Sequence, residues 1–143
     1  MLRITRSVEY GLIAVDYLAS LDGELARARD LSERLKLPAG IVAKILQRLA
    51  AAGVVVSEQG AHGGYRLGRS LDELSFLELS EAIDGPQHAT ACSDESECDR
   101  RSYCTVAGPV ADLGTQITEL LSGISVGRLL RGESAGRRKG AAV

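Results

Sequence analysis

Three cysteines are the residues of this chain best suited to chemistry, because they stand at the even spacing Cys-x5-Cys-x5-Cys in one polar stretch. Thiolates are the ligands that soft metals and iron-sulfur clusters prefer. Three thiolates leave one position of a four-ligand site open, so the source of a fourth ligand has to be found. The three residues are Cys92, Cys98 and Cys104.

The opening residues and the apolar stretches of the chain predict its compartment. The opening Met-Leu-Arg-Ile-Thr-Arg has no apolar core of a secretion signal, and no stretch approaches the roughly 18 to 20 apolar residues of a membrane span. We therefore expect a cytoplasmic protein that does not enter a membrane. In that compartment an odd number of cysteines favours metal binding or redox chemistry, although one disulfide with one free thiol stays open.

Length and composition indicate one compact domain with an appendage. The chain has 143 residues, of which 45% are hydrophobic and 25% are charged, as in ordinary globular proteins. Only 3% are aromatic, so we expect an aliphatic core. We find no nucleophile paired with a base, no phosphate-binding loop and no telling pair of carboxylates, so an enzyme is not expected.

The first third of the chain has the pattern of three helices. In 5–21 the apolar residues recur at three- and four-residue steps, which predicts an amphipathic helix. The segments 28–37 and 38–52 predict a second and a third helix, since Pro38 suits a first turn and Gly53 suits a C-terminal stop. Two helices thus meet across a very short turn.

The third predicted helix has two distinct faces. We expect its apolar residues to point into the core, namely Ile41, Val42, Ile45, Leu46 and Leu49. The opposite face holds small and polar residues, namely Gly40, Ala43, Lys44, Gln47 and Arg48. The stretch 27–48 holds six basic and two acidic side chains, a local excess of +4 in a chain whose net charge is -2. This part of the chain therefore forms a basic patch.

A hairpin is predicted next, because β-branched residues at 54–56 and an alternating pattern at 65–67 flank a glycine-rich turn. A helix-turn-helix followed by such a hairpin describes a winged helix, whose third helix can enter the major groove of DNA while the wing contacts the backbone or minor groove. The alternative is a small helix-hairpin unit that binds protein.

We expect DNA contacts from the basic patch and from the wing, namely Arg29, Lys44, Gln47, Arg48, His62, Gly63, Gly64, Tyr65 and Arg66. Gln47 could pair with adenine, and the two glycines would let the backbone approach DNA closely. Arg48 is expected either to contact a phosphate or to be tied internally to an acid.

After the hairpin, the pattern predicts a fourth helix and a long fifth one. Ser75 and Glu78 form a capping box, so a fourth helix should begin there and end near Ile83. Apolar residues then follow a 3-4-3-4 spacing, which is typical of a helix that packs against another helix. They are Val110, Leu113, Ile117, Leu120 and Ile124. We expect a twin helix from a second subunit to cover them, with packing onto the same domain as the alternative.

We thus expect a mainly α fold with a small β wing. The predicted organisation is a winged helix-turn-helix domain at 1–84, a cysteine-rich loop at 85–105, a long dimerisation helix with a short terminal helix at 106–131, and a disordered tail at 132–143.

In this order, the pieces resemble the Rrf-type family of bacterial transcription regulators over residues 1 to about 131. The resemblance rests on the evenly spaced cysteines and on five motifs: Arg-Ile-Thr-Arg-Ser-Val-Glu-Tyr-Gly-Leu from Arg3, Asp30-Leu31-Ser32-Glu33-Arg34, Ile45-Leu46-Gln47-Arg48-Leu49, Gly53-Val54-Val55 and Gly63-Gly64-Tyr65-Arg66-Leu67. It implies a homodimeric winged-helix repressor or activator that binds a double-stranded DNA operator. It also implies an iron-sulfur cluster, 2Fe-2S or 4Fe-4S, in the cysteine loop beside the dimerisation helix.

Branches of that family differ in the fourth ligand of the cluster. IscR-like members have a histidine three residues after the third cysteine, where this chain has Ala107. NsrR-like members use a carboxylate from the first helix of the other subunit, and the matching residue here is Glu9. The resemblance therefore implies a cluster held by Glu9 with Cys92, Cys98 and Cys104. His88, an exogenous thiol or water is the alternative fourth ligand.

The function that this implies is the sensing of redox state, nitric oxide or iron-sulfur status, with operator affinity changing as cluster ligation is lost. Two alternatives lack the cluster. Three cysteines and a carboxylate could hold a structural zinc ion, or the thiols could switch by sulfenic acid or disulfide formation.

Overall fold

The computed structural model describes residues 4–86, 88, 90 and 98–133. Cys92 and most of the predicted tail lie outside the described residues. The elements are α1 (Arg6–Ser20), α2 (Ala28–Leu35), α3 (Ala39–Ala51), β1 (Val55–Glu58), β2 (Gly64–Leu67), α4 (Phe76–Asp84), the 3-10 turn η2 (Arg101–Tyr103), α5 (Ala107–Ser122) and α6 (Val126–Leu130).

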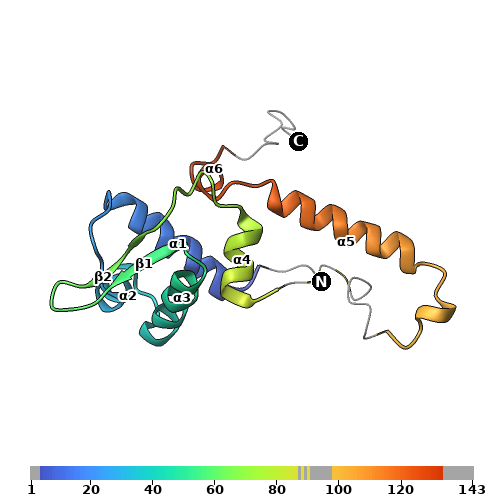
Figure 1. Ribbon diagram of the computed structural model, residues 1–143, viewed down its shortest axis with the longest axis horizontal. Helices are drawn as coiled ribbons and strands as arrows, with labels where there is room; N and C mark the ends of the chain where they lie inside the picture. The colour runs from blue at the N-terminus through green and yellow to red at the C-terminus, as the bar shows by residue number, and fades with distance from the viewer. Residues whose placement is uncertain (1–3, 87, 89, 91–97, 134–143) are drawn as a thin grey trace, which may run out of the picture.

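The prediction of a mainly helical fold with a two-stranded wing is confirmed. Helices α1 to α4 form one body, the wing projects from one end of it, and α5 extends toward the opposite end, where η2 lies (Figure 1). Strands β1 and β2 pair antiparallel, from Val55 opposite Leu67 to Glu58 opposite Gly64. The segment around η2 is therefore far from the wing of the same chain.

An aliphatic core joins the helices of the body. The largest fully buried side chains are leucines, valines and one isoleucine, and the leucines are Leu18, Leu31, Leu46, Leu49, Leu74 and Leu79. Burying one such side chain contributes about 1.5–3 kcal/mol. Ile41 was expected in this core, and this prediction is wrong, because its side chain is 41% exposed. Helical side chains tilt toward the helix N-terminus, so in the first turn of α3 Ile41 points past the end of the helix.

The predicted capping box starts α4. The Ser75 hydroxyl accepts a hydrogen bond from the backbone N–H of Glu78 at 3.1 Å, and the Glu78 carboxylate accepts one from the backbone N–H of Ser75 at 2.8 Å. The donation from the Ser75 backbone lowers the pKa of Glu78, and the nearby Arg69 guanidinium acts in the same direction. The charged form of Glu78 is thus the one that stabilises the helix.

The capping role of Glu78 predicts that the free energy of unfolding falls in acid. Folding lowers the pKa of Glu78 from its ordinary 4.5, so its contribution is present above that pH and is lost as the pH falls through the lowered value. We expect Glu78→Gln to lower the free energy of unfolding by about 0.5 kcal/mol at neutral pH. In acid the variant and the wild type should have nearly the same free energy of unfolding. Urea unfolding at both pH values measures this, with Glu73→Gln as control. A gap independent of pH would contradict it.

Helix α5 packs only partly on the body. It contacts α4, yet Leu113 and Leu120 of the predicted seam are 51% and 65% exposed. The helix ends at Ser122, so Ile124, the last residue of that seam, lies beyond it, and Gly123 occupies the C-terminal cap. Within the described part of the chain, Leu113 and Leu120 of α5 are thus left more than half exposed.

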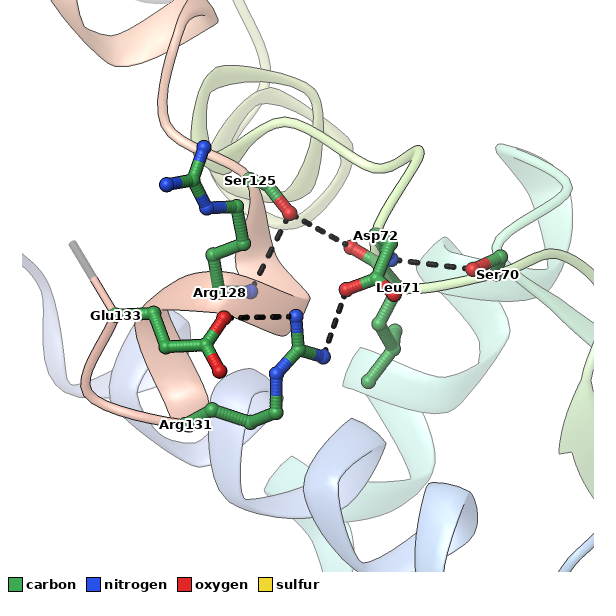
Figure 2. A network of polar contacts seen from close by, with 7 residues as sticks. All are labelled: Ser70, Leu71, Asp72, Ser125, Arg128, Arg131 and Glu133. Carbon is green, nitrogen blue, oxygen red and sulfur yellow. Dashed lines mark hydrogen bonds and ion pairs between the residues drawn. The ribbon is translucent and has the colours of Figure 1, made fainter. Parts of the chain in front are cut away.

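The C-terminal helix α6 docks back onto the segment between the wing and α4. Backbone N–H groups of Val126 and Gly127 donate to the carbonyls of Leu74 and Leu71, both at 2.8 Å. The Arg131 guanidinium bonds Asp72 at 2.8 Å and Glu133 at 3.2 Å, and Figure 2 shows this group closing the network around α6. Hydrogen bonds to its two carboxylates raise the pKa of Arg131.

Gly127 allows this docking, since a Cβ there would lie 2.2 Å from the Asp72 Oδ1 and 3.0 Å from the Asp72 backbone nitrogen. We expect Gly127→Ala to cost about 1–3 kcal/mol through overpacking. Gly40→Ala is the control, because its added methyl meets no atom within 4 Å and alanine favours the helix. Urea unfolding compares the variants, and a Gly127→Ala protein as stable as wild type would refute the fit.

Candidate functional site

The outer face of α3 presents polar side chains to solvent. Lys44 and Gln47 are exposed, and neither bonds another side chain within the part of the chain that the structure describes. Lys44 can neutralise a phosphate, and Gln47 has the donor and acceptor pair that matches an adenine edge. The face is thus available for a polyanion.

Two arginines of the basic patch have partners inside the chain. Arg29 bonds Glu33 at 2.9 Å on the exposed side of α2, and this bond raises the pKa of Arg29. Arg48 donates to the backbone carbonyl of Ile83 at 2.5 Å. Arg48 is thus bonded within the chain, as one of the two expectations had it. Its partner in this bond is a peptide oxygen at the end of α4, however, and not the expected acid.

The wing is anchored to the start of α2. Tyr65 of β2 exchanges two backbone hydrogen bonds with Ala26, at 2.7 and 2.9 Å. The Arg27 guanidinium donates to the carbonyl of Ala61 in the wing turn. Across the hairpin Arg66 pairs with Glu58 at 3.4 Å, while His62 in the turn is exposed. Arg27 was assigned no role from the sequence, since its partner is 34 residues away and carries no side-chain signal.

The glycine pair of the wing meets the protein's own backbone. A Cβ on Gly63 would lie 2.2 Å from the Glu58 carbonyl oxygen, and one on Gly64 would lie 2.7 Å from the Ala26 carbonyl oxygen. Real Cβ atoms do not approach backbone this closely. The two glycines are therefore required by the hairpin turn and by the pairing with Ala26, whether or not DNA is present.

This crowding predicts that Gly64→Ala separates the wing from Ala26. We expect a loss of about 1–3 kcal/mol in unfolding free energy. The Ala26 and Tyr65 amides should also exchange hydrogen faster, because each of them donates to the carbonyl of the other residue in the intact pairing. Gly40→Ala again serves as control. Unchanged exchange at both amides would show that the wing tolerates the methyl group.

Two of the three cysteines lie together at the start of α5. Cys98 is exposed, Cys104 is half-buried, and both are free thiols. Each lines a hollow of about 120 Å³ that Arg101, Ala107 and Ala111 also border. This volume is several times that needed for one water molecule. Two soft sulfur donors facing one hollow suit a soft metal or a cluster.

Glu9 lies elsewhere, on the first turn of α1. Its carboxylate is paired with Arg6 at 3.3 Å and is about half exposed. It borders a separate open hollow with Ile4 and Thr5. Among the described residues no three His, Cys, Asp or Glu side chains form a group that could hold a metal. Glu9 is therefore not brought to Cys98 and Cys104 by its own chain, and the alternative His88 is exposed.

Residues 4–132 match the family described as Rrf2, iron-dependent transcriptional regulator. The chain belongs to the Rrf2 family. Among its relatives, IscR of Photobacterium profundum is 31% identical over 91% of this chain and 76% of its own length. IscR of Aliivibrio salmonicida is 34% identical over 71% of this chain and 60% of its own length.

Solved structures show the same fold. The global cysteine regulator CymR of B. subtilis superposes with a TM-score of 0.69 at 21% identity, covering 92% of this chain and 98% of its own. IscR of T. potens gives 0.65 at 21% identity, covering 99% and 94%. Rrf2 proteins are DNA-binding transcriptional regulators, so the predicted family is confirmed, and so is the prediction that the chain is no enzyme. Within the described ranges no helix is long and apolar enough to span a bilayer.

Proposed function

We propose that this Rrf2 protein is a homodimeric repressor of the cytoplasm that binds a double-stranded operator and senses redox state, nitric oxide or iron-sulfur status. In this proposal an iron-sulfur cluster, 2Fe-2S or 4Fe-4S, is held by Cys92, Cys98, Cys104 and the partner subunit's Glu9. The observation that carries the proposal is the shared hollow of Cys98 and Cys104 at the start of α5. The proposal includes the domain boundaries expected from the sequence, which follow residues 84, 105 and 131.

In this proposal α3 and the wing bind the operator. Lys44 and Gln47 would enter the major groove, as the second helix of a helix-turn-helix does. His62, Tyr65 and Arg66 lie in the wing, and in this proposal they would contact the DNA backbone or minor groove. Arg29 would exchange its carboxylate partner for a phosphate, which costs little because an exposed ion pair contributes only about 0–1 kcal/mol.

In this proposal α5 forms the dimer interface. Leu113 and Leu120 are more than half exposed on a helix that contacts its own body only in part. Covering them with the same helix of a second copy would remove this apolar surface from water, at about 25 cal/mol for each Å². The same arrangement would bring the first helix of one subunit toward the cysteine region of the other.

The donor set explains why the fourth ligand would be the weak one. Thiolates bind iron strongly, whereas a carboxylate oxygen is harder and binds more weakly. Glu9 is held by Arg6 in an exposed pair, so it can change partners at small cost. When bound, the cluster supplies reactivity toward oxidants and nitric oxide. Losing the carboxylate would free α1 of one subunit from the cysteine loop of the other.

Losing the link between α1 of one subunit and the cysteine loop of the other would change the geometry of the dimer and therefore its affinity for the operator. The two recognition helices must match the spacing of two half-sites, so their relative placement determines binding. Moving the operator from nearly full to nearly empty occupancy requires a difference of about 5.5 kcal/mol between the two states. In this proposal the metal-ligand bonds made or lost in each dimer supply that difference.

A thiol-based regulator without a cluster is the second candidate. Cys98 is exposed and is thus open to oxidation. Arg100 and Arg101 lie close in sequence and could stabilise a thiolate. One solved neighbour in fold, CymR of Staphylococcus aureus, is described in an oxidized form.

Anaerobic purification with iron, sulfide and zinc analysis separates these candidates. We expect a brown wild-type protein with nearly equal iron and sulfide. Glu9→Ala should lose its visible absorption in air roughly tenfold faster or more, because one ligand is gone. The control is Asp16→Ala, which removes another exposed carboxylate of the same helix.

Other outcomes each identify an alternative. A colourless protein with one zinc ion would indicate a structural site. A metal-free protein that forms a disulfide under mild oxidant would indicate the thiol switch. If Glu9→Ala bleaches no faster than Asp16→Ala, Glu9 is not the fourth ligand, and His88→Ala becomes the next variant.

A further inference from the structure

The C-terminal end of α4 is bonded to two other helices. The last carbonyls of a helix lack partners within it and carry partial negative charge. Helix α4 has no basic residue in its own last turn. Arg48 of α3 supplies one instead, donating from its guanidinium to the Ile83 carbonyl at 2.5 Å. Arg48 is therefore a C-terminal cap delivered from the recognition helix.

The same end of α4 is bonded to the start of α1. The Thr5 hydroxyl donates to the Asp84 carboxylate at 2.6 Å, and it accepts from the backbone N–H of Val8, which caps α1. Glu9 follows within one helical turn, and its N–H donates to the Thr5 carbonyl. The helix that carries Glu9 is thus joined to the residue that ends α4.

Ile83 packs where the three helices meet. Its side chain is 1% exposed and fills the space that a Cβ of Gly11 would need, with the Cδ1 atom only 2.2 Å from that position. Ile45 of α3 lies 3.7 Å from the same point. A close-packed contact of this kind transmits a displacement instead of absorbing it.

The cysteine loop begins directly after this junction. Helix α4 ends at Asp84, and Gly85 turns the chain away with a φ of 84°. A rearrangement of the loop therefore acts first on the helix end that Arg48 and Thr5 hold. The exposed Lys44 lies one turn before Arg48 on the same helix.

We propose that Arg48 is a positioning residue, which couples the cysteine loop to the recognition helix through its bond to the Ile83 carbonyl, and is not a phosphate contact. This inference rests on the proposed function, in which α3 reads DNA and the loop holds a cluster. A shift of the α4 end moves the acceptor of Arg48, and the orientation of α3 follows. The coupling is contained within one subunit.

The test uses Arg48→Met, Arg48→Lys and the matched variant Lys44→Met in the full-length protein. The probe is a DNA duplex selected from a random-sequence pool by the wild-type protein. Affinity is measured over a range of salt for the cluster-loaded and cluster-free forms. Arg48 is exposed, so the variants should fold, and Arg48→Lys retains a cation that can donate hydrogen bonds.

Loss of a phosphate contact and loss of a positioning bond give different results. Lys44→Met should weaken both forms alike and reduce the salt slope by about one. Arg48→Met should keep the wild-type dependence of DNA affinity on salt. It should also make the DNA affinities of the cluster-loaded and cluster-free forms similar, whereas allosteric coupling of the usual size would separate them by about 5-fold to 150-fold in the wild-type protein. Arg48→Lys should retain part of that separation.

An Arg48→Met protein that behaves like Lys44→Met would overturn the proposal, and so would one that keeps the full separation. Hydrogen exchange of the cluster-free protein gives a second measure, because the amides of α3 and of Gly85 should exchange faster in Arg48→Met than in Lys44→Met. If the wild-type forms bind DNA equally, the proposed sensing fails together with the coupling. The exchange data then still decide whether Arg48 ties α3 to α4.

Discussion

The packing of α1 against α4 across Gly11 is the constraint on which the helical body depends. With no side chain at Gly11, the buried Ile83 can sit between α1 and Ile45 of α3, so three helices share one contact. Any larger residue at 11 would separate α1 from α4 and leave a gap, and gaps in a core cost both transfer and dispersion energy. The polar bonds of Thr5 and Arg48 lie at the edge of this contact and reinforce it.

A second joint connects the long helix to the same body. Because α6 docks on the segment between the wing and α4, the C-terminal end of α5 is held near the body, while its start extends away from it toward η2 (Figure 1). This arrangement leaves the apolar residues Leu113 and Leu120 for a partner, so a dimer would complete both the core and the ligand set of the proposed cluster.

Charge is distributed in agreement with a DNA-binding role, although the chain as a whole is slightly acidic. Six of the 17 basic side chains lie in the stretch 27–48, which spans α2 and most of α3 and holds only two acidic ones. A local field of this kind matters more for DNA than net charge does. Within this patch the arginines are not equivalent. Arg29 has an exposed partner that a phosphate can replace, whereas Arg48 is bonded to the backbone at a helix end. One cation of the patch thus serves the fold.

Local chemistry was readable from the sequence alone: hydrophobic periodicity predicted the helices, Ser75 and Glu78 predicted the start of α4, and glycine with β-branched residues predicted the wing. These signals are contained within one turn or one hairpin. The ligand set of the cluster came from family resemblance and remains a proposal. Only the tertiary structure decided that Ile41 is exposed, that Gly64 is crowded by Ala26, and that Arg48 bonds Ile83. Those outcomes depend on contacts between residues far apart in the chain, which no local pattern encodes.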